Sequence, residues 1–388
     1  MEVLLMTTRI GIEKEVLDWA IVKSNKEYEV IQKKFPKIEE WRLNKTKPTF
    51  KQVEGLSSFL NVPFGYLLVD TPPKEDIELL KFRTVNSEER KHTSRELIDT
   101  INDMEIKQEW MKEYLVSEGY EKNHIVERLN SNLNPTELAK ELRSLIDLPV
   151  EWYKESNKSN AFAYLRRKIS YNGILVMQNG IVKNNTHRAL DVEEFRAFCL
   201  IDDYAPLIFI NTKDSENGKI FSLLHELVHI GLGIENIYNE TDIIHEHSEL
   251  EAICNKVAAE ILVPTDKFIH KWENESLTRE KDKIESLSNE FVASKIVLAR
   301  KALDQKLIDN NLYTEIVDET KKTIEKLYKP KSSGGNAINN AKSRIDTNFA
   351  IAVSDGLKSG KALYSDIYKL TGINNKIFNK VIERLEGE

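Results

Sequence analysis

The sequence predicts an α+β protein that is mostly helical, with a small β-sheet in its central part and helical domains on both sides. Two observations lead to this prediction. Apolar residues recur at helical spacing through residues 12–69, and they do so again in the last 50 or so residues. Between these parts lie three short runs of β-branched, aromatic and other apolar residues, at 174–177, 198–201 and 207–210. We predict a helical domain at 1–70, a helical connector at 71–155, a central α+β domain at 156–330 and a small helical domain at 331–388.

Length and composition exclude several classes of protein. At roughly 100–200 residues per domain, a chain of 388 residues holds two or three domains. Its hydrophobic fraction of 40% is too high for a disordered chain. Two cysteines, Cys199 and Cys254, exclude a disulfide framework and suit a reducing compartment. No apolar run approaches the roughly 20 residues that span a bilayer, and the first nine residues carry no small-residue cleavage site. We therefore expect a soluble cytoplasmic protein with no membrane partner.

Charge is distributed unevenly along the chain. The net charge is −7, whereas residues 23–51 hold nine basic and four acidic residues, a local charge of +5, so that the remainder carries −12. A basic N-terminal segment on an acidic protein suggests a nucleic-acid-binding module joined to another domain. A solvated lysine-rich surface explains the same pattern, and charge alone leaves both interpretations open.

The helical parts are predicted from apolar spacing and from breaker residues. In the N-terminal part we expect helices at 13–22 and 27–35, a third segment around Trp41, and a further helix after Pro48. Residues 70–75 have the composition of a linker. In the connector, one apolar stripe is expected to face a core; it comprises Leu97, Ile101, Met104, Met111 and Leu115.

Further along the chain, the pattern changes to helix, strands and helices again. Asn134, Pro135 and Glu137 form the N-cap, first turn and capping box of a helix. A helix at 160–170 precedes the three predicted strands, and helices resume from about 218. Residues 331–336 form a flexible break before the last helices.

The chemically informative motif is H-E-x-x-H at residues 225–229, on an apolar helical background. Four residues make just over one helical turn, so His225 and His229 project from the same face and can hold one Zn²⁺ ion. Glu226 lies beside the first ligand, where it can accept a proton from a water at the metal. Two histidines and a glutamate on an apolar helix also need a compensating partner, which a metal supplies.

A third protein ligand is expected from a neighbouring helix, and the best candidate is Glu251. Asn255 lies four residues later on the same face, where it can orient a ligating histidine. Glu249 is the rival carboxylate. His245 and His247 lie between the two predicted helices, and they either replace Glu251, assist the reaction, or belong to a mobile loop.

Four other residues near the motif are weaker candidates. Cys254 has apolar neighbours and is expected to be a small buried residue rather than a ligand. Glu260 falls further round its helix and is expected to face away from the motif. Tyr204 and Tyr238 are the nearest hydroxyl donors for an oxyanion, and the sequence does not choose between them.

Such a site predicts peptide-bond hydrolysis. Zinc held by two histidines and one glutamate lowers the pKa of a water to about 7, and Glu226 transfers its proton to the leaving amine. The strand at 207–210 precedes the motif helix, and it either offers an edge to an extended substrate or is an ordinary buried strand.

At three places the sequence resembles the ImmA/IrrE family of bacterial and phage-associated metallopeptidases. These are residues 207–229, which end in the H-E-x-x-H motif, the segment from Glu251 through Asn255 to Pro264, and residues 362–372. Cys254, Val257 and Val263 depart conservatively from the family pattern. The resemblance implies a cytoplasmic zinc endopeptidase that cleaves a protein substrate, often a helix-turn-helix transcriptional repressor, in response to stress.

Longer members of the family carry an N-terminal Xre-type helix-turn-helix, which residues 37–68 resemble, and residues 82–84 resemble the junction that follows. The usual turn residues between the first two helices are replaced here by residues 24–26. This module binds either double-stranded DNA, through residues 12–69, or protein. If it binds DNA, the expected phosphate contacts are Lys37, Arg42, Lys45 and Lys47.

Two other functions remain open from the sequence. One is a DNA-binding regulator or antitoxin-like partner, in which the zinc fold is a sensor or scaffold. The other is a zinc-dependent hydrolase of small molecules. The complete set of His225, Glu226, His229 and Glu251 favours the endopeptidase, because a scaffold has no use for Glu226.

Overall fold

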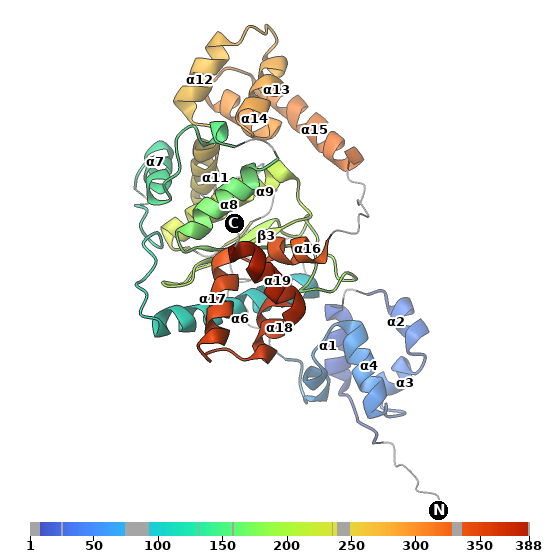
Figure 1. Cartoon of the computed structure of the whole chain (residues 1–388). Coiled ribbons are helices and arrows are strands. Elements are labelled where there is room, and N and C mark those ends of the chain that lie inside the picture. Colours follow the sequence, from blue (N-terminus) through green and yellow to red (C-terminus); the bar gives the residue numbers. More distant parts are fainter. Residues whose placement is uncertain are drawn as a thin grey trace, which may run out of the picture. The chain divides into compact units, whose positions relative to one another are not determined.

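The computed structural model describes residues 8–24, 26–73, 93–130, 132–156, 159–234, 236–238, 249–327 and 336–386. The chain divides into two compact units, Met1–Ile101 and Asn102–Glu388, which we describe separately. The structure is mostly helical with one small sheet, as predicted (Figure 1). None of its helices, within the described ranges, has the length and apolar character needed to span a membrane.

The first unit is a bundle of short helices around its own apolar core. Its elements are α1 (Lys14–Lys23), α2 (Tyr28–Lys34), α3 (Ile38–Arg42), α4 (Phe50–Leu60) and the 3₁₀ helix η1 (Phe64–Leu68). The predicted helices of this part are confirmed. Thr49 and Gln52 form a capping box at the start of α4. The fully buried core residues include Val16, Leu17, Ile31, Val53 and Leu56. Residues 82–84 of the predicted junction lie outside the described residues.

The second unit contains residues 102–117 of α6 (Arg95–Ser117) and all later elements. Before the sheet come α7 (Pro135–Leu145), η2 (Trp152–Lys154) and α8 (Ala161–Tyr171). One helix, α9 (Glu216–Leu232), lies in sequence between the last two strands of the sheet. After the sheet come α11 (Glu249–Leu262), α12 (Thr265–Asn274), α13 (Glu280–Glu290), α14 (Lys295–Asp304) and α15 (Asn310–Leu327). The chain ends with α16 (Ala337–Arg344), α17 (Thr347–Lys358), α18 (Tyr364–Thr371) and α19 (Asn375–Glu386). The predicted capping box of Asn134 and Glu137, with Pro135 in the first turn, is present at α7.

The sheet has four strands in the order β1-β3-β2-β4. They are β1 (Leu175–Asn179), β2 (Ala197–Leu200), β3 (Leu207–Asn211) and β4 (Asn236–Tyr238). β1 runs parallel to β3, and the other pairs are antiparallel.

The structure decides between the two alternatives that the sequence leaves open for residues 207–210, in favour of an ordinary buried strand. β3 lies between β1 and β2, so it has no edge to offer a substrate strand. All five of its residues are buried, which is typical of an interior strand covered on both faces. The strands at the edges of the sheet are β1 and β4.

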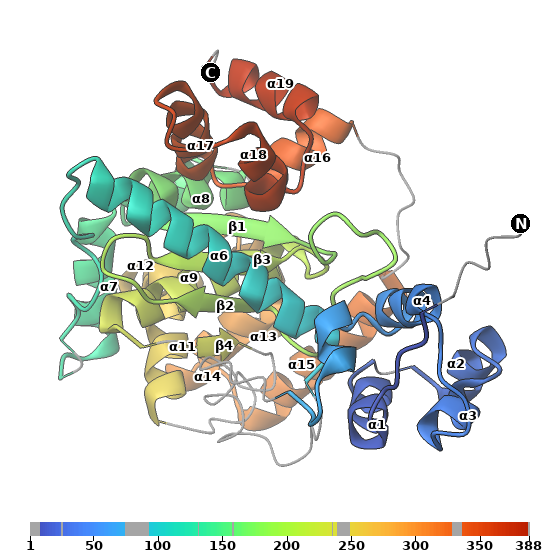
Figure 2. The ribbon, with the colours of Figure 1, turned by 90° about the horizontal axis from the view of Figure 1, so that it is seen from below.

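Helices cover both faces of the sheet. On one face, Ile208 and Ile210 of β3 join the large apolar core that α8 and α9 share. On the other face lies α6, from which the Gln108 side-chain amide donates to the carbonyls of Leu200 and Ala205 at 3.0 Å each. Figure 1 shows α8 and α9 on one side of β3 and α6 on the other, and Figure 2 shows α6 crossing the sheet.

The C-terminal helices pack against β1 and α8. The guanidinium of Arg166, on α8, donates to the carbonyls of Ser343 and Ile345 at 2.7 Å each. Asp346, the N-cap of α17, accepts a hydrogen bond from the backbone N–H of Val176 in β1. An edge strand otherwise exposes such N–H groups, so these helices close the β1 side of the sheet.

Candidate metal centre

The H-E-x-x-H motif lies in α9, a helix with defined ends and a buried body. The Ser215 hydroxyl caps its N-terminus by accepting from the N–H of Gly218. Gly233 ends it in the left-handed region (φ 71°), which favours glycine. His225, Glu226 and His229 are all fully buried. The apolar sequence around them explains this, because α9 is covered along almost its whole length.

Glu251, from α11, meets the two histidines and completes a compact cluster. The Nε2 atoms of His225 and His229 are 3.1 Å apart. The two carboxylate oxygens of Glu251 lie 3.2 Å from His225 Nε2 and 3.4 Å from His229 Nε2. Within the described residues, these three side chains form the one group of histidine, cysteine and acidic residues with the geometry to hold a metal.

The spacing of these atoms fits a metal ion. Zinc ligands lie about 2.0–2.1 Å from the ion, so that tetrahedral donors are separated by about 3.3 Å. The separation of 3.1 Å between the two imidazole nitrogens, and those of 3.2 and 3.4 Å from these nitrogens to Oε2 and Oε1 of Glu251 respectively, bracket that value. Two imidazole nitrogens and a carboxylate oxygen are also a donor set that divalent transition metals prefer. The residues therefore fit a metal ion at this position.

The ionisation of the cluster suits metal binding. Burial lowers the pKa of His225 below its ordinary value and thus favours the neutral imidazole. Burial alone opposes ionisation of Glu251, but hydrogen bonding with His225 and His229 outweighs it and lowers the pKa of this carboxyl. Neutral imidazole and ionised carboxylate are the forms that bind metals.

Asn255 lies one turn after Glu251, and its side chain is near enough to His225 to act on the pKa of that imidazole, which it raises. This contact can fix the orientation of that imidazole. Glu226, next in sequence to His225, is fully buried beside the cluster.

Residues 170–303 match the family model Peptidase_M78, described as the IrrE N-terminal-like domain. The matched segment contains the sheet, α9 and α11, and it supports a metallopeptidase-type function and the predicted relation to the ImmA/IrrE family. It includes neither the first unit nor the C-terminal helices. No curated protein matches the chain.

Buried polar contacts hold the C-terminal end of α11, some from inside the Peptidase_M78 segment and some from residues before it. The ammonium of Lys301, on α14, lies 2.6 Å from the Glu260 carboxylate and 2.9 Å from the Thr265 hydroxyl. Arg143 donates to the carbonyl of Glu260 at 3.0 Å, and the Trp152 indole donates to that of Ile261 at 3.2 Å. Glu260 thus faces away from the cluster, as expected. Sequence reasoning missed Lys301, because its partners are remote in the chain.

Several candidate residues lie outside the cluster. Glu249 is exposed, so the cluster contains Glu251 and not its rival. Cys254 is buried as expected, and burial raises the pKa of its thiol. Tyr204 contributes no ligand atom to the cluster. His245 and His247 lie outside the described residues, and of Tyr238 only the backbone is described.

The predicted phosphate contacts of the first unit occupy different surroundings. Lys37 and Lys47 line one surface hollow together with Arg9. Arg42 instead pairs with Asp18 at 2.5 Å, which links α3 to α1. Lys45 is exposed. Their part in nucleic-acid binding stays a prediction.

Proposed function

We propose that this protein is a zinc-dependent endopeptidase that hydrolyses a peptide bond in a protein substrate. His225, His229 and Glu251 would hold the ion. The convergence of these three donors from α9 and α11 is the observation that carries the proposal. The Peptidase_M78 match over the same segment supports it independently.

Bound zinc supplies Lewis acidity, which lowers the pKa of a water and polarises a carbonyl. Glu226 adjoins the first histidine of the cluster and is enclosed with it. Its carboxylate would accept the proton of the attacking water and deliver it to the nitrogen of the leaving amine. Asn255, whose side chain acts on His225, would help to hold that ring in position.

A cavity of about 690 Å³ lies one helical turn from the cluster. Phe221, one turn before His225, Asn255, one turn after Glu251, and Arg300 of α14 line it, whereas the three cluster residues do not. β1 is closed by Asp346, so β4 is the sheet edge that we propose for strand addition by an extended substrate.

The substrate class and the role of the first unit rest on the family resemblance. We infer that the substrate is a transcriptional repressor, that the first unit acts as a helix-turn-helix regulatory domain, and that the protein works in the cytoplasm. The basic hollow that contains Lys37 and Lys47 supports contact with double-stranded DNA.

A comparison of the wild-type protein with Glu226→Gln tests the proposal. Both full-length proteins are loaded with zinc and incubated with lysate of a host cell, and newly formed protein N-termini are identified by mass spectrometry. We expect new termini with the wild type only, at about 10²–10⁴ times the rate of the variant, with equal zinc content in both. Equal products from both proteins, or none from the zinc-loaded wild type, would contradict the endopeptidase and favour a sensor or scaffold.

A further inference from the structure

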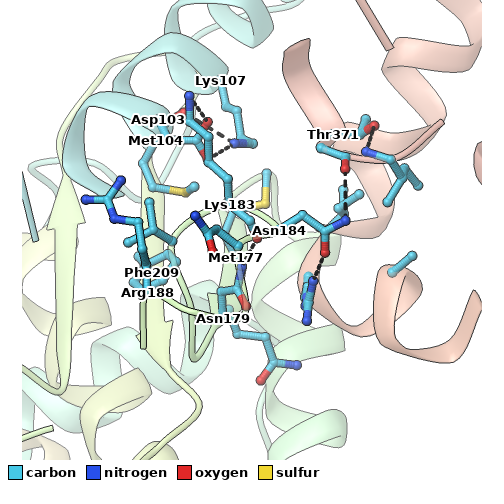
Figure 3. A pocket seen from close by; sticks show the side chains of 18 of the residues that line it. Asp103, Met104, Lys107, Met177, Asn179, Lys183, Asn184, Arg188, Phe209 and Thr371 are labelled. Carbon is cyan, nitrogen blue, oxygen red and sulfur yellow. Dashed lines mark hydrogen bonds and ion pairs between the residues drawn. The ribbon is translucent and has the colours of Figure 1, made fainter. Parts of the chain in front are cut away.

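A second cavity lies on the opposite face of the sheet from the metal cluster. Its volume is about 640 Å³. Ile208 faces the core shared with α9, whereas the next residue of β3, Phe209, lines this cavity. Its other walls are α6, the end of β1, the loop at 182–188 and the C-terminal helices α16 and α18 (Figure 3). The cavity is therefore separate from the proposed catalytic site.

The cavity has a strong excess of positive charge. Among the described residues that line it, five are basic and one, Asp103, is acidic. The basic residues are Lys107, Lys183, Arg188, Arg344 and Lys369. Asp103 is shared between two of them: it forms a buried ion pair with Lys107, and the Lys183 ammonium lies 3.8 Å from its other oxygen. Figure 3 shows these three side chains meeting at one end of the cavity.

An apolar wall adjoins these charges. It consists of Met104, Met177 and Phe209, which come from α6, β1 and β3. Arg344 and Lys369 belong to the C-terminal helices on the other side. A ligand that fits this arrangement combines an apolar or planar body with an anionic group.

The loop that carries Lys183 is held in place by its own hydrogen bonds. The backbone N–H of Val182 donates to the backbone carbonyl of Arg188 at 2.9 Å, and the Asn179 side-chain amide donates to the Lys183 carbonyl at 2.7 Å. The side-chain oxygen of Asn184 accepts from Arg344 of α16 at 2.7 Å, which joins the loop to the C-terminal helices. A preformed wall reduces the ordering that a ligand must bring about.

We propose that this cavity binds a small phosphorylated compound with a ring, about the size of a mononucleotide. Arginine and lysine are the side chains that recognise phosphate, the former through paired donors and the latter as a point charge. The volume lies within the range of about 300–1,000 Å³ that small-molecule sites occupy. A nucleic-acid duplex is too wide to enter. A ligand in this place contacts the sheet, α6 and the C-terminal helices together.

Titration of the full-length protein tests the proposal. Binding of adenosine 5′-monophosphate and of inorganic phosphate is measured by calorimetry and thermal unfolding, against adenosine and against sodium chloride at equal ionic strength. We expect saturable binding of the monophosphate and of phosphate. Adenosine should bind at least about tenfold more weakly than the monophosphate, because it lacks the anionic group.

Charge-reversal variants locate the binding site. Lys183→Glu and Lys369→Glu change exposed side chains of the lining, so both proteins are expected to fold. Each should weaken binding of the monophosphate at least about tenfold. Lys380→Glu is the matched control, since Lys380 is exposed on α19 and does not line the cavity. Zinc content, measured in every variant, should stay unchanged.

Three results would overturn the proposal: absence of saturable binding of both phosphate and the monophosphate to the wild type, adenosine binding as tight as that of the monophosphate, or equal loss of affinity in Lys380→Glu. None of these results depends on peptidase activity. Failure of this proposal is therefore distinguishable from failure of the endopeptidase.

Discussion

The carboxylate of Asp346 accepts a hydrogen bond from the backbone N–H of Val176 at 3.1 Å, across 170 residues of sequence. The same side chain caps α17 by accepting from the N–H groups of Asn348 and Phe349. One buried carboxylate thus satisfies the edge of β1 and the start of a C-terminal helix.

This double role makes Asp346 a sensitive position for stability. We expect Asp346→Ala to lower the free energy of unfolding by about 2–4 kcal/mol, because it removes a helix cap and leaves a buried N–H without its acceptor. Asp346→Asn keeps one acceptor oxygen where the carboxylate uses both, so it should recover only part of that loss. Urea unfolding monitored by circular dichroism measures both, and equal stability of Asp346→Ala and the wild type would contradict the interpretation.

Metal binding should depend on the three cluster residues and not on a nearby carboxylate outside the cluster. We expect His225→Ala, His229→Ala and Glu251→Ala to lose the ion, and Glu249→Ala, with an exposed carboxylate on the same helix, to retain about one ion per chain. Elemental analysis of dialysed proteins measures this. Loss in Glu249→Ala together with retention in Glu251→Ala would reassign the third ligand.

Chelation should destabilise the wild type, because a metal that binds only the folded state raises its stability. We expect the thermal midpoint to fall after treatment with a chelator and to return on addition of zinc. Glu251→Ala serves as the control, and its midpoint should not respond to either treatment. An identical response of wild type and Glu251→Ala would show that the effect arises elsewhere.

The buried pair of Lys301 and Glu260 should contribute strongly to the position of α11. Lys301→Met leaves the Glu260 carboxylate buried without its cation, and we expect a loss of about 3–5 kcal/mol in unfolding free energy. Lys295→Met, on the same helix, breaks only the exposed pair with Glu285 and should cost less than about 1 kcal/mol. Denaturant titration compares the two. Similar losses would contradict a special role for Lys301.

For the first unit, we expect binding to duplex DNA that weakens with salt. Lys37→Ala and Lys47→Ala should each reduce the slope of log affinity against log salt by about 1, because each would remove one phosphate contact. Fluorescence anisotropy at several salt concentrations measures the slope. Lack of duplex binding at low salt would leave protein contact as the function of this unit.

Local sequence patterns were sufficient to predict the helices and the two histidines of the metal cluster. The H-E-x-x-H spacing predicts a shared helical face, and α9 places His225 and His229 on it because helical geometry is a local property. The capping box of Asn134 and Glu137 is local for the same reason. The apolar spacing likewise sufficed for the helices of the first unit, since each buries one face against its neighbours.

Features that depend on residues remote in the chain became visible only in the tertiary structure. These are the choice of the third ligand, the order of the strands and the second cavity. Glu249 and Glu251 are both acidic residues near the start of α11, and the packing of that helix against α9 buries one and exposes the other. The apolar run of β3 does not reveal its neighbours, and the order β1-β3-β2-β4 made it an interior strand. The cavity lined by Lys107, Lys183 and Lys369 gathers charges from three distant segments, which no periodicity along one segment can bring together.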